Sequence, residues 1–219
     1  MPPTGIQVPS SLQPGQPAPD FSLPAIHREG KISLADYKGR TPLLLALFRG
    51  VYCPFCRRAI AQLGRTADKL KAAGVETLGV VATQADRARL YFRYHPTRLP
   101  LAADPDLATL RAFRVPKPEA TPQLVEQIKG VRTDVGGELS EPMPIMDALN
   151  ALDEKDRFEH TPADNEEMEK QFGQLVGQFL LDRDGIIRWV NIEAREGLAG
   201  LGKFPSDDEF LAAAAALRA

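Results

Sequence analysis

Cysteine is scarce in this 219-residue sequence: there are two, Cys53 and Cys56, and both lie in one short stretch. Two cysteines cannot form the disulfide framework that stabilises small secreted domains. A disulfide between positions so close together would close a very short loop and add little to the stability of the fold. The pair is therefore better explained by reactivity than by architecture.

The sequence also lacks an excess of charge of either sign and any long apolar run. Its formal net charge is −2, so there is no global basic field to attract nucleic acid or anionic lipid. No apolar run is long enough to cross a bilayer. Residues 1–20 are rich in Pro, Gly, Ser and Gln and lack the apolar segment of a secretion signal. We therefore expect no nucleic-acid or membrane partner and a cytoplasmic location.

What the sequence does contain is the alternation of strands and helices that is typical of an α/β fold. Residues 43–48 and 75–82 are apolar runs of strand length, the pattern of strands buried on both faces. Between them, apolar residues at helical spacing predict a helix from Pro54 that Gly74 ends. The pattern of Thr83 to Asp86 predicts a capping box for the next helix, so the order indicates a parallel sheet.

The regular pattern stops over residues 115–173, which we interpret as an insertion folded over the sheet. This stretch contains one clearly bounded helix, with Thr121 as its cap and Gly130 at its end, and a second amphipathic segment. The sheet resumes with a predicted hairpin at residues 178–191. We therefore expect a flexible lead-in over residues 1–14 and a single domain over residues 15–219.

The cysteine pair lies where a predicted buried strand gives way to a predicted helix. Cys53 would sit at the first helical turn, where unpaired amides and the positive end of the helix dipole stabilise an anion such as a thiolate. Arg49, Arg57 and Arg58 add positive charge nearby in sequence, although Arg57 and Arg58 could instead point to solvent. We expect the pKa of Cys53 to fall below the free value of about 8.5.

The spacing of the two cysteines suits a dithiol–disulfide cycle. Residues three apart on a helix are neighbours, so a small adjustment brings the two sulfurs into bonding reach. Cys53 would attack an oxidant or a disulfide, and Cys56, one turn inside, would resolve the sulfenic acid or mixed disulfide. Pro54 fits the first helical position, where its missing N–H costs nothing.

Two other interpretations of the pair stay open. CxxC is a common half of a zinc site, although the other two ligands would have to come from His27, His95, His160 or carboxylates. A structural role would simply pack two small apolar residues beneath the strand. Position and spacing favour redox activity, and we expect no metal or other cofactor.

Other candidate residues have simpler explanations. Trp189 alternates with its neighbours in a strand and is expected to cover the core. His95 lies at a helix end, where the helix dipole favours it, and His160 lies in an acidic, exposed insertion. Residues 166–169, Glu-Glu-Met-Glu, are most simply a solvated helix face. None of these residues is assigned a catalytic role.

Four segments carry a resemblance to a known family: GQPAPDFSL at 15–23, FRGVYCPFCR at 48–57, LAADPD at 101–106 and FLLDRDGII at 179–187. They resemble the alkyl-hydroperoxide-reductase/thiol-specific-antioxidant (AhpC/TSA) type of redoxin, a peroxiredoxin-like branch of the thioredoxin superfamily. The resemblance implies a thioredoxin-like fold, with a central mixed β-sheet flanked by helices. The insertion, largely helical or irregular, would precede the last β-hairpin.

The sequence differs from the family pattern around the first cysteine. Where the family places a Pro and a Thr or Ser before its peroxide-reactive cysteine, this chain has Ala46 and Gly50. The family's peroxide-polarising arginine would fall on Val176. Tyr52, an aromatic residue before the CxxC, is similar instead to thioredoxins, but no Pro precedes the strand at Gln178, where thioredoxins carry one. The chain therefore lies between the two types.

The resemblance implies an oxidoreductase that cycles Cys53 and Cys56 between dithiol and disulfide, with Arg49, Tyr52 and Pro54 in support. It would be a peroxiredoxin-like antioxidant protein or a thiol-disulfide oxidoreductase. Its substrate would be a peroxide or a protein disulfide, and its reductant a thioredoxin or glutathione system. This fold often pairs at sheet edges, so a homodimer is one expected assembly.

A non-enzymatic redox sensor or binding scaffold is the alternative function. The missing Pro, Thr and Arg of the peroxide site motivate it. In that case the insertion would dock a partner through the amphipathic face of Ile145, Leu149 and Leu152.

Overall fold

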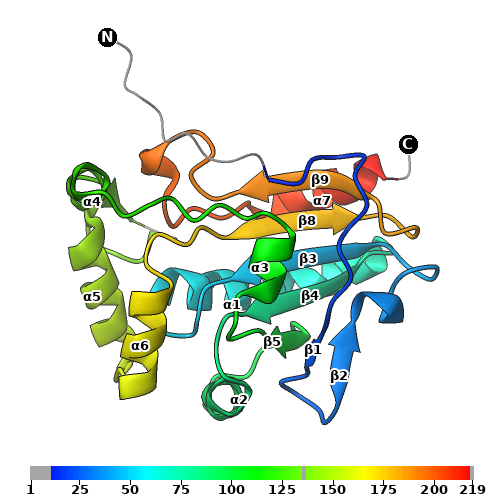
Figure 1. Cartoon of the computed structure of the whole chain (residues 1–219), viewed down its shortest axis with the longest axis horizontal. Helices are drawn as coiled ribbons and strands as arrows, with labels where there is room; N and C mark the ends of the chain where they lie inside the picture. Colours follow the sequence, from blue (N-terminus) through cyan, green and yellow to red (C-terminus); the bar gives the residue numbers. More distant parts are fainter. Residues whose placement is uncertain (1–10, 135–136, 218–219) are drawn as a thin grey trace.

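A mixed β-sheet forms the centre of the protein in the computed structural model, which describes residues 11–134 and 137–217. Its strand order is β5-β4-β3-β8-β9 (Figure 1). β3 pairs in parallel with β4, and β4 with β5, whereas β8 is antiparallel to both β3 and β9. The bounds are β3 (Leu43–Phe48), β4 (Glu76–Val81), β5 (Leu101–Ala103), β8 (Gly177–Leu181) and β9 (Ile187–Ile192).

Helices cover both faces of this sheet, as predicted. α1 (Pro54–Ala72) and α7 (Asp207–Ala216) lie behind it in Figure 1, and α3 (Ala108–Ala112) lies in front. Trp189 of β9 is partly buried, with its ring 6.0 Å from that of Phe210 in α7. Its predicted place as cover for the core is therefore confirmed.

The local signals around α1 have the predicted effects. Every residue of β3 is buried, as expected of a continuous apolar run at the centre of a sheet. Pro54 opens α1, and Gly74 follows its end with a φ of +77°, a conformation that glycine adopts without a Cβ penalty. α2 (Ala85–Tyr94) connects β4 to β5.

Near the start of the described residues, β1 (Ser22–Pro24) and β2 (Lys31–Ser33) form an antiparallel hairpin, which η1 (Leu34–Asp36) follows. Most of the predicted lead-in, residues 1–10, lies outside the described residues. Leu12, within the same lead-in, is buried in the core.

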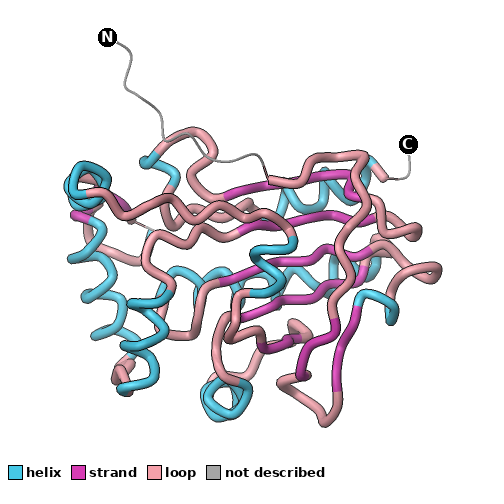
Figure 2. Tube along the Cα trace, viewed as in Figure 1, coloured by secondary structure: helices cyan, strands magenta, loops and turns pink. Residues whose placement is uncertain are grey.

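The insertion consists of helices and a pair of two-residue strands joined by irregular segments (Figure 2). The N-cap predicted at Thr121 is confirmed, since its hydroxyl accepts a hydrogen bond from the Leu124 amide. One pair of two-residue strands was not predicted, because two residues are too short to carry a hydrophobic pattern. The elements are α4 (Pro122–Lys129), β6 (Arg132–Thr133), β7 (Met143–Pro144), α5 (Ile145–Asp156) and α6 (Pro162–Lys170).

The apolar face of α5 is covered by the protein itself. Ile145 and Leu152 are buried, and Leu149 is partly buried against the same core. α5 lies beside α4 and α1. The hypothesis that this face docks a partner is therefore wrong, because its apolar surface already has a partner within the chain.

The last hairpin contains an irregularity in its register. Leu180 pairs with Trp189, but Leu181 pairs with Ile187, so Arg188 is an extra residue in β9. This is a β-bulge, which leaves one residue unpaired and bends its strand. The chain then passes through η3 (Leu198–Gly200) to α7, where Ser206 and Glu209 form a capping box.

Within residues 11–134 and 137–217, no helix combines the length and apolar character that crossing a membrane requires.

Candidate active site

The two cysteines lie at the carboxyl end of β3, where the sequence predicts them. Cys53 is the N-cap residue of α1, and Cys56 lies in the first turn of that helix. The Cys53 amide donates to the Gly50 carbonyl over 3.1 Å, and the Arg57 amide donates to the Cys53 carbonyl over 3.1 Å. Both are free thiols, with Cys53 4% exposed and Cys56 fully buried.

The surroundings shift the two thiols in opposite directions. Burial raises the pKa of Cys53, but a hydrogen bond with the Cys56 thiol, the positive charge of Arg49 and the Cys56 backbone amide outweigh it and lower the pKa to about 5. Burial, the hydrogen bond to Cys53 and the charge of Cys53 raise the pKa of Cys56 well above its ordinary value. Near neutral pH, the site therefore holds a nucleophilic thiolate beside a protonated thiol.

Arg49 is fixed beside the cysteines by a buried ion pair. Its guanidinium donates to both carboxylate oxygens of Glu193, over 2.7 and 3.1 Å, and to the Gln174 carbonyl over 2.9 Å. Burial works against its positive charge, but the charges of Cys53 and Glu193 raise the pKa of Arg49 well above its ordinary value. Arg49 thus keeps a permanent positive charge against the thiolate.

The loop between β3 and α1 is held by Gln171, which follows α6. The amide oxygen of Gln171 accepts from the Gly50 backbone N–H over 3.0 Å and from the Tyr52 hydroxyl over 3.3 Å. The amide nitrogen of Gln171 donates to the Ala82 carbonyl over 2.6 Å. Burial and the charge of Cys53 raise the pKa of Tyr52 well above its ordinary value, so it remains a neutral donor.

Thr83 lies in this network and does not cap α2. The N-cap of α2 is Gln84, which makes no side-chain cap hydrogen bond, so the predicted capping box is wrong. The Thr83 hydroxyl accepts from the Val51 amide over 3.0 Å and donates to the Glu167 carboxylate over 2.9 Å. A hydroxyl that bonds to a distant carboxylate is no longer available to its own helix.

Glu167 also differs from its predicted place. The solvated helix face predicted for residues 166–169 is wrong at this position, because Glu167 is buried and accepts from both Thr83 and the Gln84 amide. Burial raises the pKa of Glu167 despite these hydrogen bonds.

The same network explains why position 50 carries no hydroxyl side chain. A Cβ at Gly50 would lie 2.8 Å from a carboxylate oxygen of Glu167, 2.8 Å from the Thr83 hydroxyl and 2.8 Å from the Tyr52 ring. A Thr or Ser therefore cannot occupy this position without a rearrangement of its neighbours.

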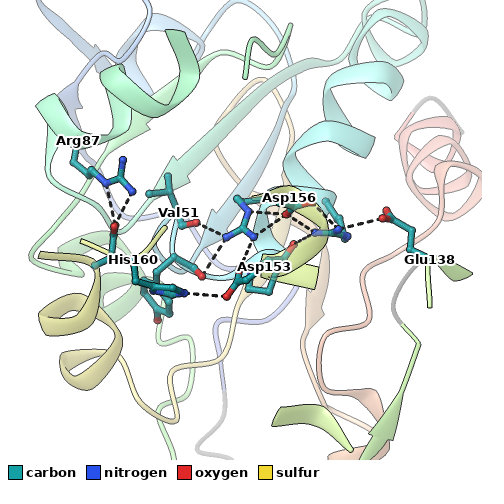
Figure 3. Close-up of polar contacts among 11 residues, drawn as sticks. Val51, Arg87, Glu138, Asp153, Asp156 and His160 are labelled. Atoms are coloured by element: carbon teal, nitrogen blue, oxygen red, sulfur yellow. Dashed lines mark hydrogen bonds and ion pairs between the residues drawn. The ribbon is translucent and has the colours of Figure 1, made fainter. Parts of the chain in front are cut away.

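Arg57 does not point to solvent, which corrects one of the orientations left open above. It is buried and donates to Asp153 over 2.6 Å, to Asp156 over 2.7 Å and to the Val51 carbonyl over 3.0 Å (Figure 3). Its guanidinium lies 4.2 Å from the centre of the Phe158 ring. The positive charge of Arg57 is thus neutralised by ion pairs with the two carboxylates of α5.

Further ion pairs attach the insertion to the core. Arg58 binds both oxygens of Asp156 over 2.9 Å each, and Glu138 over 3.1 Å. Arg87 of α2 binds Asp164 of α6 over 2.7 Å (Figure 3). The insertion therefore covers the residues that lead into the cysteine pair.

The histidines considered for a metal site do not converge on the cysteines. His160 forms a 2.9 Å contact with Asp153, and His95 stacks on Tyr91 with ring centres 4.4 Å apart. His27 packs edge-on to Phe92. Among the described residues, no group of three or more His, Cys, Asp or Glu side chains is arranged to hold a metal ion.

Three polar residues of this site were not found from the sequence: Gln171, Glu193 and, in its actual role, Glu167. Gln171 contacts the loop before Cys53, Glu193 contacts Arg49, and Glu167 contacts Thr83 and the Gln84 amide, each from more than 80 positions further along the chain. The one available signal was a glutamate two residues after the predicted last strand, which is not specific enough to indicate a site.

Comparison with protein families gives one match over most of the chain. The model described as the AhpC/TSA family matches residues 14–190. That range contains all four resembling segments and the insertion between them.

Two curated relatives carry the same name. Thiol-disulfide oxidoreductase ResA of Bacillus thuringiensis subsp. konkukian (strain 97-27) is 26% identical over 129 residues, which span 56% of this chain and 73% of the relative. The protein of that name from Bacillus cereus (strain ATCC 10987 / NRS 248) matches to the same extent.

Solved structures are similar over nearly the whole chain. The reduced 2-Cys peroxiredoxin of Plasmodium vivax has a TM-score of 0.58 at 14% identity, covering 93% of this chain and 95% of that one. Peroxidoxin BcpB of Mycobacterium tuberculosis has a TM-score of 0.55 at 15% identity, covering 94% and 97%. At these identities the similarity concerns the fold, and the predicted thioredoxin-like fold is confirmed.

Proposed function

Because the chain belongs to the AhpC/TSA family and is a thiol-based oxidoreductase, we propose that Cys53 is its nucleophile and Cys56 its resolving thiol. The observation that carries this assignment is the opposite shift of the two pKa values, down to about 5 for Cys53 and upward for Cys56. A thiolate attacks, and a thiol that stays protonated until the first product forms is suited to resolve it. Arg49 stabilises the thiolate, and Pro54 and Tyr52 fix the turn that presents it.

With a hydroperoxide as substrate, the proposed reaction has two steps. The Cys53 thiolate attacks one peroxide oxygen, the O–O bond breaks, and the leaving oxygen takes up a proton as water or an alcohol. Cys56 then attacks the Cys53 sulfenic acid, an S–S bond forms and water leaves. Two thiols have been oxidised and one hydroperoxide reduced, and one thioredoxin dithiol or two glutathione thiols restore the starting state.

The burial of the site favours a small oxidant. Cys53 is 4% exposed, and the loop before it is held by residues of the insertion. A hydroperoxide is small enough to reach such a sulfur after a local fluctuation, whereas a protein disulfide would require the insertion to move. We therefore propose a hydroperoxide as the substrate of the dithiol form.

Thiol–disulfide exchange is the second candidate, and two observations favour it. The curated relatives are named thiol-disulfide oxidoreductases, and the chain has Ala46 and Gly50 where the peroxide-reactive pattern has Pro and Thr. In this case Cys53 would attack a protein disulfide, and Cys56 would release the reduced product from the mixed disulfide.

Trapping of free thiols by alkylation tests the proposal. Equimolar hydrogen peroxide should remove both thiols of the wild type together, leave Cys53→Ser reduced, and stop Cys56→Ser at a sulfenic acid that a dione probe captures. Rates with hydrogen peroxide and with a protein disulfide then separate the two candidates. If Cys53 alkylates no faster at pH 7 than a free thiol, and both thiols survive peroxide, the assignment is wrong.

A further inference from the structure

Arg49 and Glu193 meet because of the strand order. β3 and β9 lie on either side of β8 and are both antiparallel to it, so their carboxyl ends reach the same edge of the sheet. Arg49 directly follows β3 and Glu193 directly follows β9. The start of β8, at Val176 and Gly177, lies between them. The topology thus brings together two charged side chains that are far apart in the sequence.

The carboxylate of Glu193 has an unusually complete set of donors. Besides both guanidinium nitrogens of Arg49, it accepts from the Val176 amide over 3.2 Å and from the Gly202 amide over 2.7 Å. Its side chain is fully buried, and that of Arg49 is 13% exposed. Two donors from the main chain leave the carboxylate little freedom to move.

The backbone around Glu193 is shaped to supply these amides. Ala194 has a φ of +57°, a left-handed conformation that is unfavourable for a residue with a Cβ. The tight turn that follows, closed by a 2.9 Å hydrogen bond from the Gly197 amide to the Ala194 carbonyl, returns the chain so that Gly202 reaches the carboxylate. Such strain persists where the surrounding structure requires it.

We propose that Glu193 is a positioning residue for the redox reaction: its carboxylate, anchored by two main-chain amides, holds the Arg49 guanidinium against the Cys53–Cys56 pair. Glu193 acts through Arg49 and does not itself touch the reacting sulfurs. The inference rests on the proposed function, since it assigns a role in preparing the same thiolate.

Two effects of Glu193 on Cys53 have opposite signs, which makes the role testable. As an anion it opposes the formation of a thiolate, whereas as an anchor for Arg49 it favours one. The other titratable groups that face the site are Cys56 on α1, Tyr52 in the loop and Glu167 on α6. A change at Glu193 that leaves these groups in place therefore reports which of its two effects dominates.

The experiment measures the pH dependence of Cys53 alkylation in Cys56→Ser protein, with and without Glu193→Gln. The glutamine keeps the size of the side chain but removes the charge that binds Arg49. A positioning role predicts that the midpoint rises by at least one pH unit, about a tenfold change in the ionisation constant. A fall in the midpoint would mean that the charge acts directly on the sulfur, and no change would mean a structural role alone. Either result overturns the proposal.

Three further variants make the result specific. In an Arg49→Gln background, Glu193→Gln should not raise the midpoint again, because the residue through which it acts is gone. Glu193→Asp, which keeps the charge but is one methylene shorter, should also raise the midpoint, and it replaces Glu193→Gln if that variant does not fold. Asp104→Asn is the matched control: Asp104 is buried at the end of β5 and accepts two main-chain amides, so this variant should lower thermal stability and leave the midpoint unchanged.

Failure of this inference can be distinguished from failure of the proposed function. If wild-type Cys53 lacks a lowered midpoint and survives peroxide, the proposed function fails. If wild-type Cys53 has the lowered midpoint and reacts, but Glu193→Gln behaves like the wild type, only the role of Glu193 fails.

Discussion

Arg49 and Arg57 lie at equal distances along the chain from Cys53, one four positions before it and one four positions after it. Both are largely buried, and both bind carboxylates that come from much later in the chain. Only Arg49 contributes to the lowered pKa of Cys53. The difference lies in what each guanidinium faces.

Arg49 is bound from the side of the sheet, by a carboxylate that follows β9, and its remaining surface faces the thiolate. Arg57 is used up by two aspartates of α5 and by the carbonyls of Val51 and Tyr52, so it holds the insertion and the loop together. Arg49 therefore lowers the pKa of Cys53, whereas Arg57 holds the insertion against α1. Proximity in sequence therefore does not identify the residue that tunes a cysteine, whereas the geometry of its partners does.

The largest expected effect comes from Arg49→Gln. Without the guanidinium, Cys53 loses a positive charge and a hydrogen bond, so its pKa rises from about 5 although the hydrogen bond with Cys56 remains. The midpoint of Cys53 alkylation against pH should rise by at least one unit, so that alkylation below the midpoint slows by about tenfold. Arg57→Gln, measured in parallel, should stay close to the wild-type rate. Equal slowing in both variants would contradict the contrast between the two arginines.

Arg57→Gln should instead weaken the attachment of the insertion. It leaves one oxygen of Asp153 and two loop carbonyls without the Arg57 donor, while Asp153 keeps His160 and Asp156 keeps Arg58. The expected loss of stability is about 1–3 kcal/mol in chemical unfolding. Limited proteolysis should then cut first between residues 115 and 173. Cleavage elsewhere, with an insertion as resistant as in the wild type, would show that other contacts hold it.

Acid should release the insertion before it opens the sheet. Burial raises the pKa values of Asp156 and Asp164, but hydrogen bonds from their arginines outweigh it and lower both below the ordinary range. Because the folded values lie below the unfolded value of about 3.9, the stabilisation is complete above that pH and is lost as the pH falls through the folded values. Protection factors, which correct hydrogen exchange for its intrinsic pH dependence, should be unchanged from pH 7 to about 5 and should fall first in α5 and α6 below about pH 4. An equal loss of protection from exchange in β3 and α5 would contradict the prediction that the insertion is released first.

The smallest effect is expected from Thr121→Ala. The Thr121 hydroxyl caps α4 at the outer part of the insertion and touches neither arginine cluster. Loss of one N-cap costs about 1 kcal/mol. Fraying of α4 in hydrogen exchange, with unchanged alkylation of Cys53, would show that the insertion can loosen locally without affecting the site. A change in Cys53 reactivity would mean that the cover acts as one rigid unit.

Much of the fold could be predicted from local patterns. β3 and β4 are continuous apolar runs, and α1 has an apolar stripe between a proline and a glycine. The apolar periodicity and the residues that begin and end each element therefore agree with the tertiary structure. The CxxC could be interpreted as a redox site for the same reason, because that interpretation depends on a strand before it and a helix after it.

The rest of the site depends on contacts that no local pattern contains. Thr83 has the composition of a helix cap, but a buried carboxylate from α6 competes for its hydroxyl. Glu167 stands in an acidic run that is typical of a solvated surface, and only the docking of α6 buries it. Glu193 is an isolated residue after a strand. The fold brings such partners together from distant parts of the chain, and their spacing in the sequence does not indicate that they will meet.

The extra residue in β9 has a consequence for any chain of this type that gains or loses a residue in its last hairpin. Side chains on a strand alternate between the two faces of the sheet. Arg188 is an extra residue in β9, so this alternation is interrupted between Ile187 and Trp189. Removal of Arg188 would restore a regular register, because the pairs of Leu180 with Trp189 and of Leu181 with Ile187 would then be consecutive. Removal of one residue between Trp189 and Glu193 would instead direct Glu193 to the opposite face, away from Arg49. We therefore expect a length change some distance from the cysteines to alter the environment of Cys53 without changing a residue that touches it.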